Sequence, residues 1–381
     1  MNSEKTAPFR SSKIKADTQC APLSWRKACV HTECSLHQIA PYIGKIKSSI
    51  ARELIHHYSQ SGHLVVDPFA GAGTIPLEAA IHGRRVFCAD VSPYSRILSR
   101  AKLLPPASVE DALELAEHAV REAKKLPTPD LRSIPGWVRH FFHPKTLQDA
   151  VQFAEVARKP GNEFIMACFL GILHHQRPGF LSYPSSHLVP YLRDKNYPRS
   201  KFPEMYCYRE LKPRLLRKIH RTYKRFEKPA SSDVIFVQRA VQRVTLPNQF
   251  HSVVTSPPYM NALDYARDNR LRLWFIDPTL ARYMDDSHTQ RRDSFVDAMC
   301  SFALKVQKGL QKSGFCVIVV GEDLGRSFNA HPSETVLKIV NEKAPSLKLK
   351  TVLTDDIPDV RRTRRRCTGV KTEHFLIFQR L

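Results

Sequence analysis

The sequence predicts a doubly wound α/β fold, in which a mixed, mostly parallel sheet is covered by helices, with a C-terminal antiparallel hairpin and a largely helical insert. The apolar run 64–66 leads into a glycine-rich turn, a helical pattern and a second strand at 84–90, which is the βαβ succession of a parallel sheet. A proline-broken region at 105–230 interrupts this pattern. Residues 348–354 and 374–379 alternate like the two strands of a hairpin.

Helical patterns lie on both sides of the first strand. Residues 36–60 and residues 75–80 both carry apolar side chains on one helical face, so each segment is expected to contain a helix. The strand at 84–90 then ends in an acid, Asp90. This order places a loop and a carboxylate at the same edge of the expected sheet.

The insert is expected to be mostly helical. Its helices are predicted at 108–126, on either side of Gly161 within 144–175, and at 209–228, where the helix is strongly basic. The stretch 176–208 is rich in proline and tyrosine, which predicts irregular structure.

The core pattern returns after the insert. Strands are predicted at 235–237, at 251–259, where the strand runs into a turn, and at 315–322, and helices at 293–312 and 332–344. We therefore expect an N-terminal tail at 1–35, a first half of the core at 36–104, the insert at 105–230 and a second half of the core at 231–381.

The charge balance predicts a polyanionic partner. Lysine and arginine number 59 against 36 aspartates and glutamates, a formal net charge of +23, and nucleic acid is the commonest partner of such a chain. An arginine cluster in the expected hairpin loop is a candidate for phosphate contact: Arg361, Arg362, Arg364, Arg365 and Arg366. The longest apolar run, 164–173, is far shorter than the ~18 residues of a membrane span, so no membrane is expected.

The cysteines favour a reducing compartment. Nine are present at irregular spacings, with no C-x-x-C pair, so neither a disulfide framework nor a metal site is expected. The N-terminus has no apolar core of the signal-peptide kind. We therefore expect a cytoplasmic protein that associates with the nucleoid through its partner.

The glycine-rich turn, DPFAGAGT at 67–74, predicts a ligand-binding loop. Gly71 and Gly73 allow the backbone to turn tightly and to approach a ligand closely. The loop follows the first strand, where open α/β sheets bind ligands, and Asp90 is placed to accept hydrogen bonds from a ribose. The alternative is a well-packed tight turn, but the two flanking acids favour a nucleoside cofactor.

A second motif, TSPPY at 255–259, follows a later strand. Two successive prolines cannot continue a ladder, because neither donates an N–H. Ser256 Oγ and the Pro257 carbonyl are able to accept hydrogen bonds from an amino group, and Tyr259 is able to stack on a base. The alternative is a simple turn at a strand end.

DPFAGAGT followed by Asp90 resembles the cofactor motif of S-adenosylmethionine-dependent methyltransferases that modify exocyclic amino groups, which have a Rossmann-like core. The preceding HQIAPYIGKIKSSIARELI is similar to the helix that closes over the cofactor in such enzymes. The resemblance implies that Asp90 holds the ribose and that the residues around the methionine part are Asp67, Phe69, Ala70, Gly71, Gly73 and Thr74.

The TSPPY form resembles the cytosine-N4 DNA methyltransferases. It implies a catalytic set of Ser256, Pro257, Pro258 and Tyr259, duplex DNA as substrate, the insert as the DNA-reading part and a cognate restriction endonuclease as a further partner. One departure is the dipeptide Gln238-Arg239, which stands where family members often have Gly-Asp.

Three other functions remain open. These are adenine-N6 methylation of DNA, guanine-N2 methylation of RNA, and nucleic-acid binding by a relative without activity. The sequence leaves the recognition site and the oligomeric state undetermined.

Overall fold

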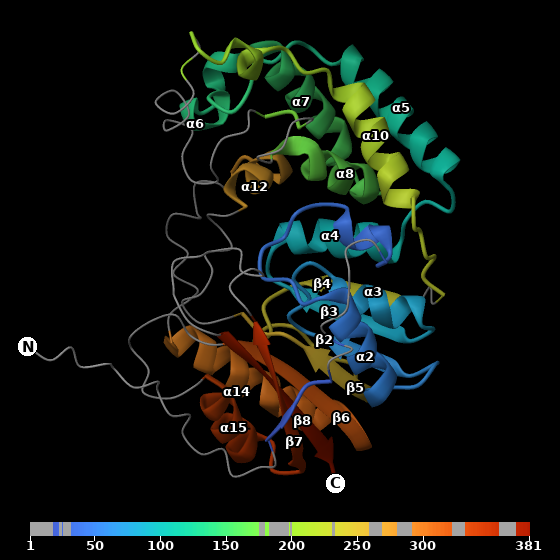
Figure 1. The fold of residues 1–381 in the computed structure, drawn as a ribbon, viewed down its shortest axis with the longest axis vertical. Helices are drawn as coiled ribbons and strands as arrows, with labels where there is room; N and C mark the ends of the chain where they lie inside the picture. Colours follow the sequence, from blue (N-terminus) through green and yellow to red (C-terminus); the bar gives the residue numbers. More distant parts are fainter. Residues whose placement is uncertain are drawn as a thin grey trace, which may run out of the picture.

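The computed structural model describes residues 18–22, 25, 32–174, 180–182, 198, 200–230, 233–258, 269–279, 292–321, 332–357 and 371–381. One eight-stranded sheet crosses this part of the molecule, with helices on its two faces and a helical body beyond one end (Figure 1). Its strand order is β1-β7-β8-β6-β5-β2-β3-β4.

Five neighbouring strands of the sheet are parallel: β4 (Val234–Gln238), β3 (Arg85–Asp90), β2 (Leu64–Asp67), β5 (Phe250–Thr255) and β6 (Leu310–Gly321). The chain builds outward from β2 to β3 and β4, then returns to the other side of β2 with β5. The strand order therefore reverses between β2 and β5, and such a switch point opens a crevice at the carboxyl edge of a sheet.

The C-terminal hairpin is formed as predicted. β8 (Lys371–Arg380) lies between β6 and β7 (Leu347–Ile357) and is antiparallel to both. The doubly wound α/β prediction is confirmed by this topology. The strands extend beyond the predicted ranges because backbone pairing continues past the alternating apolar stretch.

The parallel strands are buried on both faces, and successive side chains divide between two cores. Val66 and Val253 pack with α14 (Arg292–Gly309) and α15 (Pro332–Lys343) on one face. On the other face, Val65 and Val254 pack with α2 and α3. These helices span Ser48–Tyr58 and Thr74–Ile81.

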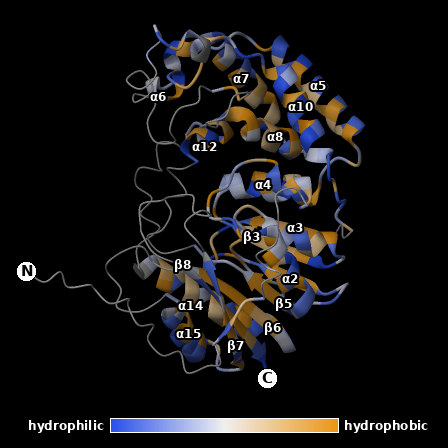
Figure 2. Ribbon diagram, viewed as in Figure 1, coloured by the Kyte–Doolittle hydropathy of each residue, from blue (hydrophilic) through white to orange (hydrophobic). Residues whose placement is uncertain are grey.

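A helical body stands on α4 (Pro93–Leu103), which lies between it and the sheet (Figure 1). The body contains α5 (Val109–Lys125), α6 (Gly136–Arg139), α7 (Pro144–Ala157), α8 (Glu163–Leu173) and α10 (Leu211–Tyr223). Every residue of α8 is buried, so this helix is the centre of the body, whereas α5 and α10 turn hydrophilic faces outward (Figure 2).

One further helix joins this body from the second half of the chain. α12 (Arg270–Ile276) follows the TSPPY motif in sequence, yet it packs against α4, α7 and α8. Sequence patterns did not predict α4 or α12. The division of the chain into domains stays a prediction, and α12 shows that the helical body also draws on residues outside 105–230.

Part of the predicted tail at 1–35 belongs to the sheet. β1 (Thr18–Cys20) pairs in parallel with β7 at the sheet edge. Trp25 is buried and meets the Phe375 ring edge-on at 5.2 Å. A three-residue strand has too few positions to show a pattern, which is why the sequence alone did not indicate it.

Two absences concern the described residues only. No helix within them is long and apolar enough to cross a membrane. No three side chains of histidine, cysteine, aspartate or glutamate gather there as a metal site would require.

The glycine loop between β2 and α3 offers a test of the packing. Gly73 has a positive φ of 69°, and a Cβ there would lie 2.7 Å from Ser99 Oγ on α4. Gly73→Ala should therefore lower the free energy of unfolding by ~2–4 kcal/mol, through backbone strain and overpacking together. Chemical denaturation of the two proteins measures the difference.

The control is Gly62→Ala. Gly62 also has a positive φ, of 80°, but nothing lies within 4 Å of the added Cβ. This variant should lose only ~1 kcal/mol, the cost of the left-handed conformation. Equal losses for the two variants would contradict the close packing of α4 on the glycine loop.

Candidate functional site

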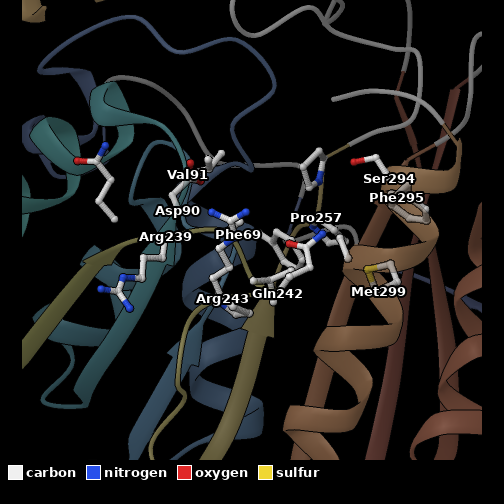
Figure 3. Close-up of a pocket in the computed structure, with 16 residues that line it drawn as sticks. Phe69, Asp90, Val91, Arg239, Gln242, Arg243, Pro257, Ser294, Phe295 and Met299 are labelled. Atoms are coloured by element: carbon white, nitrogen blue, oxygen red, sulfur yellow. The ribbon is translucent and has the colours of Figure 1, made fainter. Parts of the chain in front are cut away.

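A cavity of about 910 Å³ opens at the carboxyl edge of the parallel strands. Its walls come from the glycine loop, the end of β3, the loop after β4, the two prolines of TSPPY and α14 (Figure 3). The cavity thus lies where the strand order reverses, as expected for an open α/β sheet.

The glycine loop is held in place by backbone and buried side chains. Ala70 N donates to Ala89 O at 2.9 Å, and Lys102 Nζ on α4 donates to Ala72 O. Burial and the neighbouring Lys45 lower the pKa of Lys102 to about 7. A lysine in this place satisfies a carbonyl that the tight turn leaves without a partner in regular structure.

Gly71 lies at a point of close approach. Its φ is 49°, and an added Cβ would come within 3.5 Å of the Tyr42 ring. Tyr42 precedes α2 and stacks on Tyr94, with ring centroids 5.8 Å apart. The segment predicted to close over the cofactor therefore approaches the glycine loop through Tyr42, and α2 packs in the same apolar cluster as Ala70 of that loop.

Asp90 ends β3 and closes the loop. Its Oδ2 accepts from Gly71 N and its Oδ1 from Ser92 N, both at 2.8 Å. Burial raises the pKa of Asp90, and these backbone N–H groups partly counteract that rise because they favour the charged form. The carboxylate is thus fixed in orientation at the edge of the cavity.

Asp67 connects the two motifs. Its Oδ1 accepts a hydrogen bond from Thr255 Oγ1 at 2.6 Å and from Phe69 N at 3.2 Å. Burial raises the pKa of Asp67 to about 7, and these two hydrogen bonds counteract the rise. DPFAGAGT and TSPPY, which are far apart in the chain, therefore meet through one buried contact.

The remaining predicted residues divide into those the structure places and those it does not describe. Ser256 is half-buried directly after β5, and Pro257 and Pro258 line the cavity with Phe69 and Asp90. Thr74 begins α3, and its hydroxyl is buried without a hydrogen-bond partner among the described residues. Tyr259 and the five arginines at 361, 362 and 364–366 lie outside the described residues.

The end of β4 and the loop after it supply further cavity residues, among them the Gln238-Arg239 dipeptide that departs from the family pattern. Gln238 and Arg239 line the wall at the end of β4, where Gln238 pairs in register with Asp90. Gln242 and Arg243 lie between Asp90 and the TSPPY side of the cavity (Figure 3). In the sequence, Gln242 and Arg243 are marked only by their position shortly after β4, the third of the five neighbouring parallel strands in chain order.

The far wall comes from α14. Phe295 and Met299 lie one turn apart on this helix and both face the cavity (Figure 3). They belong to the apolar face that also covers the sheet, so their pattern indicates only a buried helix.

Known proteins match the chain over limited stretches. The family model for D12 class N6 adenine-specific DNA methyltransferases matches residues 42–131. The type II methyltransferase M.MvaI from Kocuria varians is 38% identical over 58 residues, which are 15% of this chain and 13% of that relative. The chain thus aligns with about an eighth of that relative's length.

Solved structures are similar at low identity. TrmN from Thermus thermophilus has a TM-score of 0.33 and 10% identity, over 88% of this chain and 49% of that chain. The rRNA methyltransferase aviRa from Streptomyces viridochromogenes has a TM-score of 0.32 and 11% identity, over 92% of this chain and 90% of its own.

The family match is to DNA methyltransferases, and the matched relative is a type II methyltransferase. They agree with S-adenosylmethionine as the cofactor, and they confirm the predicted resemblance to DNA methyltransferases at this level. Neither establishes cytosine N4 as the target atom, and the family match is to the adenine type.

Proposed function

We propose that this protein is an S-adenosylmethionine-dependent DNA methyltransferase that methylates cytosine N4 in duplex DNA. The observation that carries the proposal is that both motifs line one cavity, the first through Phe69, with Asp90 beside it, and the second through Pro257 and Pro258. Direct transfer requires the donor carbon and the acceptor nitrogen to approach to ~3–3.5 Å. A cavity lined by both motifs places the proposed cofactor and the target base in one space.

The charges of the glycine loop fit this cofactor. Asp67 and Asp90 end neighbouring strands, and neither forms a salt bridge within the described part of the chain. The cofactor supplies a methyl group on a cationic sulfonium, and its methionine end carries an ammonium group. The carboxylate of Asp90 lines the cavity while backbone N–H groups hold its orientation, so it is proposed to accept hydrogen bonds from the ribose hydroxyls.

Ser256 and the Pro257 carbonyl are proposed to grip the target amino group. An amino nitrogen conjugated to its ring is a poor nucleophile, and acceptors that draw it out of the ring plane expose its lone pair. No metal and no covalent intermediate are needed for that step. Tyr259 is proposed to stack on the flipped base.

Adenine N6 is the second candidate target. The motif at Ser256 resembles the cytosine-N4 enzymes, whereas the family match over residues 42–131 is to adenine-specific ones. The two targets share the same chemistry at the nitrogen. They differ in the ring that the cavity must accept, so the product decides between them.

DNA is proposed as the partner on grounds of charge. The net charge is +23, and the exposed face of α10 carries Arg217, Arg221 and Lys224 at helical spacing. Together with the arginine cluster at 361–366, these residues are candidates for phosphate contact. Association with the nucleoid in the cytoplasm and a cognate restriction endonuclease follow only if DNA is the substrate.

Removal of the Asp90 carboxylate charge should weaken cofactor binding. Asp90→Asn keeps the shape of the side chain but loses the charge, so the affinity for S-adenosylmethionine should fall by ~1.5–3 kcal/mol, the range for hydrogen bonds to charged groups. Isothermal titration calorimetry measures this. Asp233→Asn is the control, because Asp233 is an exposed carboxylate that pairs with Arg85 at the opposite edge of the sheet. An unchanged affinity in Asp90→Asn would remove Asp90 from the site.

Loss of the Ser256 hydroxyl should slow the chemistry and spare the cofactor. Ser256→Ala should lower kcat by about tenfold or more, the order of magnitude for a group that acts in the transition state. The dissociation constant of S-adenosylmethionine should stay unchanged. Ser252→Ala is the matched control on the same strand, since its buried hydroxyl has no hydrogen-bond partner among the described residues. Equal kcat values for both variants would exclude the proposed role of Ser256.

The product tests the function as a whole. Purified protein is incubated with methyl-labelled S-adenosylmethionine and duplex DNA, and the nucleosides are then separated. Label in N4-methylcytosine is expected, and label in N6-methyladenine would establish the second candidate. Label in 5-methylcytosine or only in RNA would contradict the proposal. Cofactor binding without any transfer would instead indicate an inactive nucleic-acid-binding relative.

A further inference from the structure

The contact between Thr255 and Asp67 joins the two halves of the proposed site. Thr255 is fully buried and Asp67 is 2% exposed, so water does not compete for their 2.6 Å hydrogen bond. Both this bond and the one from Phe69 N end on Oδ1 of Asp67. Among the described residues no hydrogen bond ends on Oδ2, so this oxygen remains to accept from a ligand.

The surroundings of Asp67 are acidic. Among the described residues, the charge of Asp90 at the end of β3 raises the pKa of Asp67, the Cys88 thiol lies on the same strand, and Thr255 of β5 contributes a neutral hydroxyl. A carboxyl group with acidic and no basic neighbours gains most from a cation brought by a ligand. The methionine end of S-adenosylmethionine carries a sulfonium and an ammonium group against one carboxylate, so it carries one net positive charge.

We infer that Thr255 is a positioning residue for cofactor binding: its hydroxyl holds Asp67 as the carboxylate that receives the cationic methionine end, and Asp67 releases its proton to solvent as the cofactor binds. This inference rests on the proposed function. It also makes the first residue of TSPPY part of the cofactor site. A substitution at Thr255 should therefore alter cofactor binding at Asp67.

The direction of the pH dependence follows from the charges. In the free protein burial sets the pKa of Asp67 to about 7. A bound cation lowers that pKa, so binding near neutral pH releases up to about one proton, and affinity rises with pH through the free-state pKa. Below it, the affinity should fall by up to about tenfold per pH unit.

The test is calorimetric titration of the full chain with S-adenosylmethionine between about pH 5.5 and about pH 7, where the α-amino group of the ligand stays charged. Two buffers with different enthalpies of ionisation give the number of protons released. Thr255→Val keeps the buried shape but removes the donor, so its affinity profile should move to higher pH, with binding about tenfold weaker at neutral pH. Thr255→Ser restores a hydroxyl and should recover the wild-type profile.

Two further variants separate this effect from general damage. Asp67→Asn removes the titrating group and should bind without pH dependence or proton release. Thr222→Val is the matched control, because Thr222 is a buried threonine whose hydroxyl bonds Lys218 O in α10. Its profile should equal that of the wild type.

The outcomes distinguish a failure of this inference from a failure of the proposed function. Wild-type protein that binds S-adenosylmethionine with no pH dependence and no proton release would overturn the role of Asp67 and leave the proposed function intact. A Thr255→Val profile identical to the wild type would overturn the role of Thr255. No binding at any pH would overturn the proposed function and this inference together.

Discussion

The parallel pairing of β2 with β5 is the constraint on which the site depends. These strands are adjacent although Asp67 and Thr255 are 188 residues apart in the chain. β2 ends at the first residue of the glycine loop and β5 at the first residue of TSPPY, so the register of the two strands brings both motifs to one edge of the sheet. The buried hydrogen bond between the two side chains fixes that meeting point.

Three lysines donate hydrogen bonds to backbone carbonyls of segments that pack beside the sheet. Lys102 donates to the glycine loop, Lys45 to His37 O and Lys218 on α10 to Gln38 O. Loop carbonyls that enter the interior need donors, and a lysine reaches further than a backbone N–H does. Burial lowers the pKa of all three lysines, and each donates a hydrogen bond to a backbone carbonyl in the interior.

Local patterns predicted most of the fold, since amphipathic helices and apolar strands leave regular spacings. The glycine loop and TSPPY identified the cavity because turns of this kind have few residue choices. The contacts of Lys102 and of Thr255 within TSPPY could not be predicted in the same way: a lysine or a threonine at a helix or strand end is ordinary, and its contact is with a partner distant in sequence. β1 and α12 escaped prediction because three or seven residues carry too little periodicity, so their tertiary contacts decide them.

Because α12 packs in the helical body, that body cannot be exchanged intact as one continuous segment of the chain. Leu271, Leu273 and Phe275 of α12 are buried in the same apolar cluster as α4 and α8. A segment exchange limited to 105–230 would therefore present a foreign surface to a native α12. An intact helical body must therefore carry two separate stretches of chain, and the second stretch follows β5 and the TSPPY motif in sequence.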